Sequence, residues 1–433
     1  MTNPRYLIAK LLDKTFRNAS YSNIQLNSGL EKSDLDIQGK KLCTAIYYGV
    51  IQRKITLDYI IKKYCSRPIE KMDSIVVTIL RCGIYQILFM DNIPDSIAVN
   101  ESVALAKKFG KTSASGMINA VLRNFIRDGK KFVCNGEKPE MISVKFSIPV
   151  QLADSFINDY GEEKTESFLS HSLSAGVTYI RRNPLKCTDE QLRKSLDGIE
   201  LYTDNNMCYW FKGGDIINTS AFKSGFFHVQ DISSQICCMA LNPSENDMVL
   251  DICSAPGGKT FTMAELMNDR GEIHAFDLHE KRVKLIQDGA KRLGLTNIKV
   301  QKGDALIFNH ELPKYTKILC DVPCSGFGVI RHKPEIKYKN LSDFESLTEI
   351  QYSIAENSLK YLAIGGEMVY STCTLRRAEN DEVVKKLLAN HPEIELINIP
   401  EIMGQKFENP VTLFPFMTDG GDGFFIAKFR KMY

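Results

Sequence analysis

The sequence predicts a multidomain chain with an all-α bundle, a small α+β subdomain and an α/β domain built on a largely parallel sheet. Three observations favour this fold class. Apolar residues repeat at helical spacing over the first 130 residues, a polar segment with Gly and Pro follows at 131–140, and strand-like runs alternate with helical patterns after residue 230. At 433 residues the chain is also long for one hydrophobic core.

Residues 1–130 are expected to be helical throughout, because their apolar residues recur three and four positions apart. The clearest runs are Leu7 to Leu12, Leu57 to Tyr64, Val76 to Leu88 and Val121 to Phe125. In DNIPDSIAVNESVALAKKFG we expect Asn100 to cap a helix and Gly110 to end it.

The charge of this first segment is unusual. It carries 20 Lys and Arg against 11 Asp and Glu, although the net charge of the whole chain is only +3. A basic module attracted to a polyanion such as nucleic acid is one interpretation. A solvated helical surface is the other, and charge alone does not choose between them.

Residues 131–140 form a predicted linker, and residues 141–230 a small α+β subdomain with a helix near QLADSFINDYG. From 231 to 433 five apolar strands are expected, at DMVLDIC, EIHAFDL, NIKVQKGDA, KILCDVP and GEMVYSTC, with a helix from Leu347 to Leu362 before the last. Alternation of this kind predicts a parallel sheet covered on both faces, which binds ligands at the carboxyl ends of its strands.

Composition excludes several classes of protein. The most apolar run, from Ile75 to Met90, is interrupted by Arg81 and is too short to cross a bilayer. The start, MTNPRYLIAK, has no secretory pattern, so we expect a cytoplasmic protein without membrane contact. The twelve cysteines are scattered and form no CxxC pair, which favours reduced thiols and no metal site.

The stretch DICSAPGGKT is a candidate ligand loop. Its adjacent glycines allow a ligand to approach the backbone, and the helix that follows supplies free N–H groups. Gly258-Lys259-Thr260 resembles the end of a P-loop, but Cys253 stands where that motif needs Gly, which disfavours a nucleoside triphosphate. The absence of GxGxxG disfavours a dinucleotide.

Two acidic residues complete this predicted site. Asp277 ends the second strand, where nucleotide-binding sheets place a carboxylate on the ribose hydroxyls, and Asp304 follows the third, near the expected adenine. A ribose and an adenine without a phosphate chain point to S-adenosylmethionine as the cofactor.

Two cysteines lie on loops at the same edge of the sheet. Cys324 follows the fourth strand and Cys373 the fifth, whereas a structural thiol usually lies inside an element. Carbon 5 of cytosine needs a thiolate added at carbon 6 before it can accept a methyl group, and a second group must then assist release. Asp321, beside the ring, is a candidate for hydrogen bonding at N3.

These segments resemble a known family. DICSAPGGKT, DVPCSGFGVIRHKPEIKY and YSTCTL are similar to signature blocks of RNA (cytosine-5) methyltransferases, and HVQDISSQ resembles the block before their cofactor loop. IPDSIAVNESVALAKKFGKTSASGMINAVLRN looks like the helical domain of the NusB antitermination factor. This fusion is typical of the bacterial 16S ribosomal RNA (cytosine-5) methyltransferases, and the resemblance covers nearly the whole chain.

The resemblance implies a NusB-like bundle, an RNA-binding α+β subdomain and a Rossmann-like class I methyltransferase domain. It makes Cys373 the nucleophile and Cys324 the group for proton removal or product release, acting on 16S ribosomal RNA as a monomer. The implied cofactor contacts are Cys253, Ser254, Ala255, Pro256, Gly257, Gly258, Lys259, Asp277, Asp304 and Asp321. The expected RNA contacts are Arg181, Arg182, Arg331 and Lys333, with a basic surface turn as the alternative for the last two.

Three rivals remain open at this point. A DNA cytosine-5 methyltransferase also has a Pro-Cys motif, but it uses that cysteine as nucleophile with a Glu-Asn-Val segment that is absent from this sequence. A non-catalytic RNA-binding factor would use only the NusB-like part and bind no cofactor. A P-loop NTPase would turn over ATP.

Overall fold

The computed structural model describes residues 3–18, 22–174, 176–203, 207–213, 216–418 and 420–433. Its contacts divide the chain into two compact units. The helical unit comprises Met1–Leu173 and Lys333–Lys339, and the sheet unit comprises Ser174–His332 and Asn340–Tyr433. These limits differ from the predicted boundaries at 130, 140 and 230.

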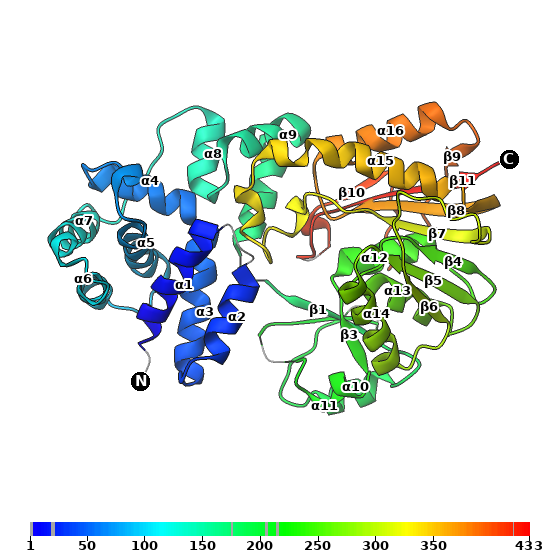
Figure 1. Ribbon diagram of the computed structural model, residues 1–433, viewed down its shortest axis with the longest axis horizontal. Coiled ribbons are helices and arrows are strands. Elements are labelled where there is room, and N and C mark those ends of the chain that lie inside the picture. The colour runs from blue at the N-terminus through cyan, green and yellow to red at the C-terminus, as the bar shows by residue number, and fades with distance from the viewer. Residues whose placement is uncertain (1–2, 19–21, 175, 204–206, 214–215, 419) are drawn as a thin grey trace. The chain divides into compact units, whose positions relative to one another are not determined.

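The helical unit is built from the helices labelled α1 to α9 in Figure 1. Their bounds are α1 Pro4–Asn18, α2 Ser22–Glu31, α3 Ile37–Gln52, α4 Lys54–Tyr64, α5 Ser74–Phe89, α6 Asp95–Lys108, α7 Ser115–Arg127, α8 Lys138–Phe146 and α9 Val150–Leu173, the last with a break at Gly161. The predicted helical runs are therefore confirmed.

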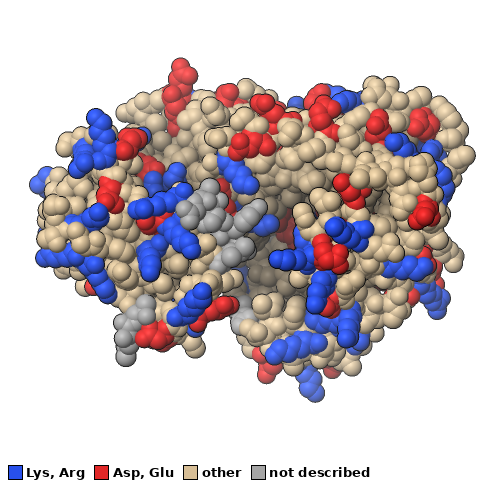
Figure 2. Space-filling model, viewed as in Figure 1, with Lys and Arg blue, Asp and Glu red and all other residues tan. Residues whose placement is uncertain are grey.

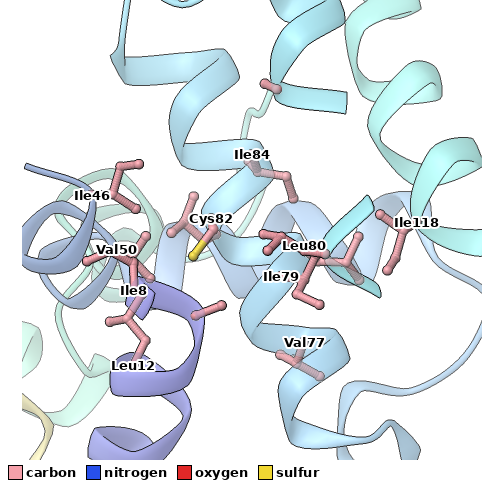
Figure 3. Packing of buried hydrophobic residues seen from close by; sticks show 14 of the residues in the cluster. Ile8, Leu12, Ile46, Val50, Val77, Ile79, Leu80, Cys82, Ile84 and Ile118 are labelled. Carbon is pink, nitrogen blue, oxygen red and sulfur yellow. The ribbon is translucent and has the colours of Figure 1, made fainter. Parts of the chain in front are cut away.

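The core of this unit surrounds α5, which buries residues on nearly every side. In Figure 3, Ile8 and Leu12 of α1 and Ile46 and Val50 of α3 point toward it, with Ile118 of α7 on another side. An amphipathic helix would bury only one stripe. The long apolar run from Ile75 to Met90 is thus explained by the burial of α5 on nearly every side.

The predicted cap of α6 is wrong. Asn100 lies inside the helix, which begins at Asp95 after Pro94, whereas Gly110 does follow the helix end with a φ of +72°. Pro94 cannot donate a helical hydrogen bond, and Asp95 in the first turn complements the helix dipole. The helix therefore begins before Asn100, and Ala98 and Val99 already belong to its buried face.

Helices α8 and α9 belong to the helical unit because α8 packs on α4. The hydroxyl of Thr56 donates to the carbonyl of Val144 at 2.6 Å, and the N–H of Ile55 donates to the hydroxyl of Ser147 at 2.9 Å. The helix predicted near QLADSFINDYG therefore lies in the helical unit, and the rest of the predicted α+β subdomain, from Ser174 on, lies in the sheet unit.

Residues 333–339 join the helical unit at the end of α3. The last carbonyls of a helix have no partner within it. Tyr338 donates from its hydroxyl to Ile51 O at 2.7 Å, and Lys337, only 2% exposed, donates from Nζ to Gln52 O at 2.7 Å. A segment distant in sequence thus completes a helix C-terminus.

We expect Tyr338→Phe to destabilise the full-length protein by about 1–2 kcal/mol, because it removes the hydroxyl that donates to the Ile51 carbonyl at the end of α3. Denaturant unfolding followed by circular dichroism would measure the change. Tyr59→Phe is the matched control, since its hydroxyl donates to Val133 O at 2.9 Å on the surface and should matter less. Equal losses in the two variants would contradict the anchoring role of Tyr338.

The sheet unit contains two sheets over the residues described. Their strands are β1 Thr178–Arg182, β2 Cys208–Phe211, β3 Phe227–Val229, β4 Met248–Asp251, β5 Glu272–Asp277, β6 Ile298–Lys302, β7 Tyr315–Asp321, β8 Leu362–Thr372, β9 Ile394–Leu396, β10 Val411–Leu413 and β11 Phe424–Lys431. The smaller sheet has the order β2-β1-β3 and the larger β10-β11-β8-β7-β4-β5-β6, with β9 paired to β11.

Helices cover both faces of the larger sheet (Figure 1). These covering helices are α12 Ile232–Leu241, α13 Gly258–Leu266, α14 Glu280–Leu293, α15 Glu345–Leu359 and α16 Asp381–Asn390. Two further helices, α10 Asp189–Ser195 and α11 Ser220–Lys223, pack with the smaller sheet. Alternate residues of β4 enter opposite cores: Val249 packs with α12 to α14, and Leu250 packs with α15 and α16. Two-sided burial is why these strands read as continuous apolar runs.

All five predicted strands are present as β4 to β8, and they run parallel to their neighbours in that part of the sheet. Their carboxyl ends therefore meet at one edge. The sequence did not indicate the antiparallel addition of β11 beside β8, which makes the sheet mixed. Within the described residues, no helix has the length and apolarity to cross a membrane.

Candidate active site

The two predicted catalytic cysteines lie together at the carboxyl edge of the sheet. Cys324 follows β7 by three residues and Cys373 follows β8 directly, and because β7 and β8 are adjacent and parallel their loops meet. The two Sγ atoms are 3.0 Å apart, and both residues are partly buried. At this separation both thiols can reach the same part of one substrate molecule.

Backbone contacts hold these two loops in register. Gly328 N donates to Cys373 O at 3.0 Å, and Gly423 N donates to Gly328 O at 3.0 Å. The Ser325 and Thr374 hydroxyls are 2.8 Å apart. The positions of the two thiols are therefore set by the fold and do not depend on a flexible loop.

Glu379 is a buried carboxylate behind the cysteine loops. It accepts from Ser325 N at 2.9 Å and from Gln351 Nε2 at 3.0 Å, and it pairs with Arg376 Nη1 at 3.2 Å. Sequence reasoning missed this role. The signal was present, because a Glu six residues after Cys373 begins the turn into α16, but a helix-capping carboxylate would look the same.

The hydrogen bond between the thiols separates their acidities. Donation by the Cys324 thiol lowers the pKa of Cys373 below the ordinary cysteine value, Lys259 acts in the same direction, and burial and Asp321 oppose it. The same hydrogen bond, together with burial, raises the pKa of Cys324 well above that value. These shifts favour Cys373 as the more acidic thiol of the pair.

Alkylation of Cys373 tests this assignment. The reactive thiolate fraction rises with pH through the pKa, so the midpoint for Cys373 should lie below that of an ordinary cysteine. Cys324→Ala removes the donor and should move the midpoint to higher pH, as measured by peptide mass spectrometry after iodoacetamide pulses. Cys134→Ala, in the linker, should leave it unchanged. An unaltered midpoint in Cys324→Ala would contradict the thiol hydrogen bond.

The predicted ligand loop turns from β4 into α13 beside a cavity of about 190 Å³, called here the loop cavity. Gly257 has a φ of +107°, which permits the tight turn before Gly258 begins the helix. The loop cavity is lined by residues that include Gln230, Asp231, Asp251, Cys253, Ser254, Ala255, Pro256, Gly258, Lys259 and Asp321. Most of the predicted loop contacts therefore share one cavity.

The polar groups of this loop are arranged unlike those of a phosphate site. Lys259 Nζ pairs with Asp321 Oδ2 at 2.8 Å, and the Thr260 hydroxyl donates to Asp251 Oδ2 at 2.6 Å. Burial would lower the pKa of Lys259, but Asp321 outweighs it and raises that pKa. The lysine and threonine that a P-loop turns toward phosphate and Mg²⁺ are both engaged elsewhere, which argues against the NTPase.

Asp251 supplies an unmet acceptor in the loop cavity. Its Oδ1 has no hydrogen-bond partner in the described part of the chain, and burial raises its pKa to about 7, against the hydrogen bond from Thr260. A ligand ammonium group would satisfy this oxygen. The acidic cavity thus fits the amino-acid end of S-adenosylmethionine better than a phosphate chain.

A second cavity of about 380 Å³, the strand-end cavity, lies at the ends of β4, β5 and β6. Ile252, Phe276 and Asp304 line it, and Asp304 Oδ1 also accepts from Leu306 N at 3.0 Å. Ile252, which lines this cavity, is followed in the chain by Cys253, which lines the loop cavity. Apolar walls with one carboxylate suit a flat heterocycle such as adenine.

Asp277 is the last residue of β5. It is 3% exposed, accepts from His279 N at 3.0 Å and pairs with Arg282 Nη1 at 3.2 Å. Its position at the strand end agrees with the predicted ribose contact, although it borders neither cavity directly.

The four predicted RNA contacts differ in their exposure. Arg181 is 1% exposed, and its Nε pairs with Glu265 Oε2 of α13 at 2.8 Å, so its burial corrects the prediction that it contacts RNA. Arg182 is partly buried and donates to Cys187 O at 2.6 Å. Arg331 is partly buried in the sheet unit, whereas Lys333 is exposed in the helical unit.

The surface charge of the helical unit is mixed. On the face drawn in Figure 2, lysine and arginine side chains alternate with aspartate and glutamate over this unit. The surplus of basic residues is therefore spread out on that face.

Within the described ranges, no group of three or more His, Cys, Asp and Glu side chains could hold a metal ion.

Known proteins resemble the chain in both units. The family model of the 16S rRNA methyltransferase RsmB/F matches residues 238–430, and the NusB family model matches residues 2–127. The probable ribosomal RNA small subunit methyltransferase B of Bacillus subtilis is 36% identical over 99% of both chains, and that of Synechocystis is 32% identical over the full length of both. These matches confirm the predicted family resemblance.

A solved structure described as PH0851 shares the fold. It covers 100% of this chain with 99% of its own, at a TM-score of 0.81 and 22% sequence identity. Together with the two family-model matches, this likeness confirms the predicted NusB-like bundle and Rossmann-like methyltransferase domain.

Proposed function

Because the chain belongs to the family of ribosomal RNA small subunit methyltransferase B, we propose that it methylates carbon 5 of a cytosine in 16S ribosomal RNA. The observation that carries this proposal is the pair of thiols 3.0 Å apart with opposite shifts in pKa. Methylation at a nitrogen or a ribose oxygen needs no such pair.

In the proposed reaction the Cys373 thiolate forms a bond to carbon 6 of the ring, and the electrons of the 5,6 double bond make carbon 5 nucleophilic. S-adenosylmethionine, when bound, supplies the methyl group that carbon 5 takes up. Asp321, three residues before Cys324, is our candidate for the hydrogen bond at N3, and its carboxylate accepts from Lys259 Nζ and from the Ser371 hydroxyl, both at 2.8 Å.

Cys324 then removes the proton from carbon 5, and the returning electrons expel Cys373. Its high pKa is caused first by the hydrogen bond to Cys373. Once Cys373 is bonded to carbon 6 its sulfur is no longer a thiolate acceptor, so the Cys324 thiol can give its proton to water, and the resulting thiolate takes the proton of carbon 5. The two thiols thus take their roles in sequence.

We propose that the cofactor occupies both cavities, with the adenine in the strand-end cavity near Asp304, the ribose near Asp277 and the amino-acid end in the loop cavity. The target base has to be unstacked or single-stranded to reach the thiols. We place the protein in the cytoplasm as a monomer, with exposed Lys333 and partly buried Arg331 as candidate phosphate contacts.

The test is methylation of small-subunit RNA from cells that lack the protein, with S-adenosylmethionine as donor and nucleoside mass spectrometry as readout. We expect 5-methylcytosine at one cytosine, separated from 4-methylcytosine by chromatography. A methyl group on another atom would refute the chemistry. RNA binding without cofactor binding would support the non-catalytic RNA-binding factor, and ATP turnover would support an NTPase.

A further inference from the structure

The side-chain amide of Gln230 has a donor that no described residue satisfies. Gln230 is 6% exposed. Its Oε1 accepts from the Thr262 hydroxyl at 2.5 Å and lies 3.4 Å from His228 Nε2, which fixes the amide by its oxygen. The Nε2 group has no partner in the described ranges. A buried donor of this kind is costly unless a ligand or water completes it.

This donor faces the loop cavity beside the start of α13. Gln230 lines that cavity, and a Cβ built on Gly258 would lie 3.8 Å from its Nε2. Gly258 is the first residue of α13, and Gly257 before it gives the helix no side-chain cap. The first N–H groups of a helix are free and attract anions. Two independent sets of donors therefore converge on one region of the cavity.

The charges around the cavity say which ligand group these donors suit. Asp231, Asp251 and Asp321 all border it, and Lys259 is already paired with Asp321. A multiply charged anion would be repelled by three carboxylates. A single carboxylate that carries its own neighbouring ammonium group fits, because Asp251 Oδ1 is unpaired and can accept from the ammonium.

We propose that Gln230 Nε2, with the first N–H groups of α13, binds the carboxylate at the amino-acid end of the methyl donor. This inference rests on the proposed function, since it takes S-adenosylmethionine as the cofactor. Gln230 thereby becomes a binding residue for one end of the cofactor and makes no contact with the adenosine end, which the strand-end cavity receives.

Calorimetry with two ligands tests the proposal without turnover. S-adenosylhomocysteine carries the amino-acid end, and 5′-methylthioadenosine has the same adenosine and thioether but lacks it. We expect Gln230→Leu to weaken S-adenosylhomocysteine about 10- to 100-fold, as for loss of a hydrogen bond to a charged group, and to change 5′-methylthioadenosine by less than about 2-fold.

Two further variants keep the outcome decisive. Gln230→Glu retains an acceptor for Thr262 and replaces the donor by a carboxylate oxygen, so it should discriminate against S-adenosylhomocysteine even more strongly. Thr262→Val removes the hydrogen bond that fixes Gln230 Oε1 but keeps Nε2, so it should weaken S-adenosylhomocysteine by less than Gln230→Leu does and leave 5′-methylthioadenosine unchanged. Should Gln230→Leu not fold, Gln230→Glu provides the same comparison.

The results separate this inference from the function on which it rests. If the wild-type protein binds neither ligand, the proposed methyl-donor chemistry fails. If it binds both but the Gln230 variants lose them equally or lose neither, only the assignment of Gln230 is wrong.

Discussion

Cys373→Ala is expected to lower the methylation rate by at least about 10⁴-fold, because removal of a covalent nucleophile costs this much or more in other enzymes. It should also abolish covalent trapping on RNA that contains 5-fluorocytosine, since fluorine at carbon 5 blocks only the later proton removal. Trapping is read as a protein–RNA band that resists denaturation. In this variant Cys324 should not take over as the nucleophile. Its pKa is raised well above the ordinary cysteine value, so little of it is thiolate.

Cys324→Ala should give the opposite phenotype. The first bond to carbon 6 still forms, but release fails, so a covalent complex should accumulate even on RNA with ordinary cytosine. The pair of variants also decides between RNA-type and DNA-type enzymes. If Cys324→Ala abolishes trapping and Cys373→Ala retains it, the roles are reversed and the DNA cytosine-5 arrangement applies.

The site could be predicted as far as its residues lie at the ends of predictable strands. Apolar runs bounded by Gly and Asp identify β4, β5 and β7, and parallel order then brings Cys324 and Cys373 to one edge. No distance is implied by that reasoning. The 3.0 Å contact depends on hydrogen bonds such as Gly328 N to Cys373 O, which join residues 45 positions apart in sequence.

The sequence predictions that were wrong or missing share a physical cause. The role of each residue depends on a partner that lies far away in the sequence. Arg181 looks like a surface cation beside Arg182, but Glu265, 84 residues later, compensates its charge inside the protein. A buried charge of this kind is tolerated only when it is paired. Tyr338 likewise follows the Cys324 segment in sequence and yet completes the end of α3.

Gly328→Ala is expected to cost about 1–3 kcal/mol of stability and on the order of 10²-fold in activity. A Cβ at this position would lie 1.9 Å from Gly423 O and 2.8 Å from Cys373 O. Both neighbours are backbone atoms, so relief requires the Cys324 loop to move away from Gly423, which precedes β11, and from the Cys373 loop. Such movement would break the 3.0 Å contact between the thiols, and displacement of reacting groups by about 1 Å is enough to lower catalysis strongly.

Gly116→Ala is the matched control, because nothing lies within 4 Å of its Cβ position in α7 and alanine favours a helix over glycine. Its activity should be unchanged and its stability equal or slightly higher. For Gly328→Ala, urea unfolding, initial methylation rates and the alkylation midpoint of Cys373 should all change, because separating the thiols removes the donor that lowers the pKa of Cys373. A folded, slow variant with a wild-type midpoint would show that the loops act on the RNA and not on the thiol pair.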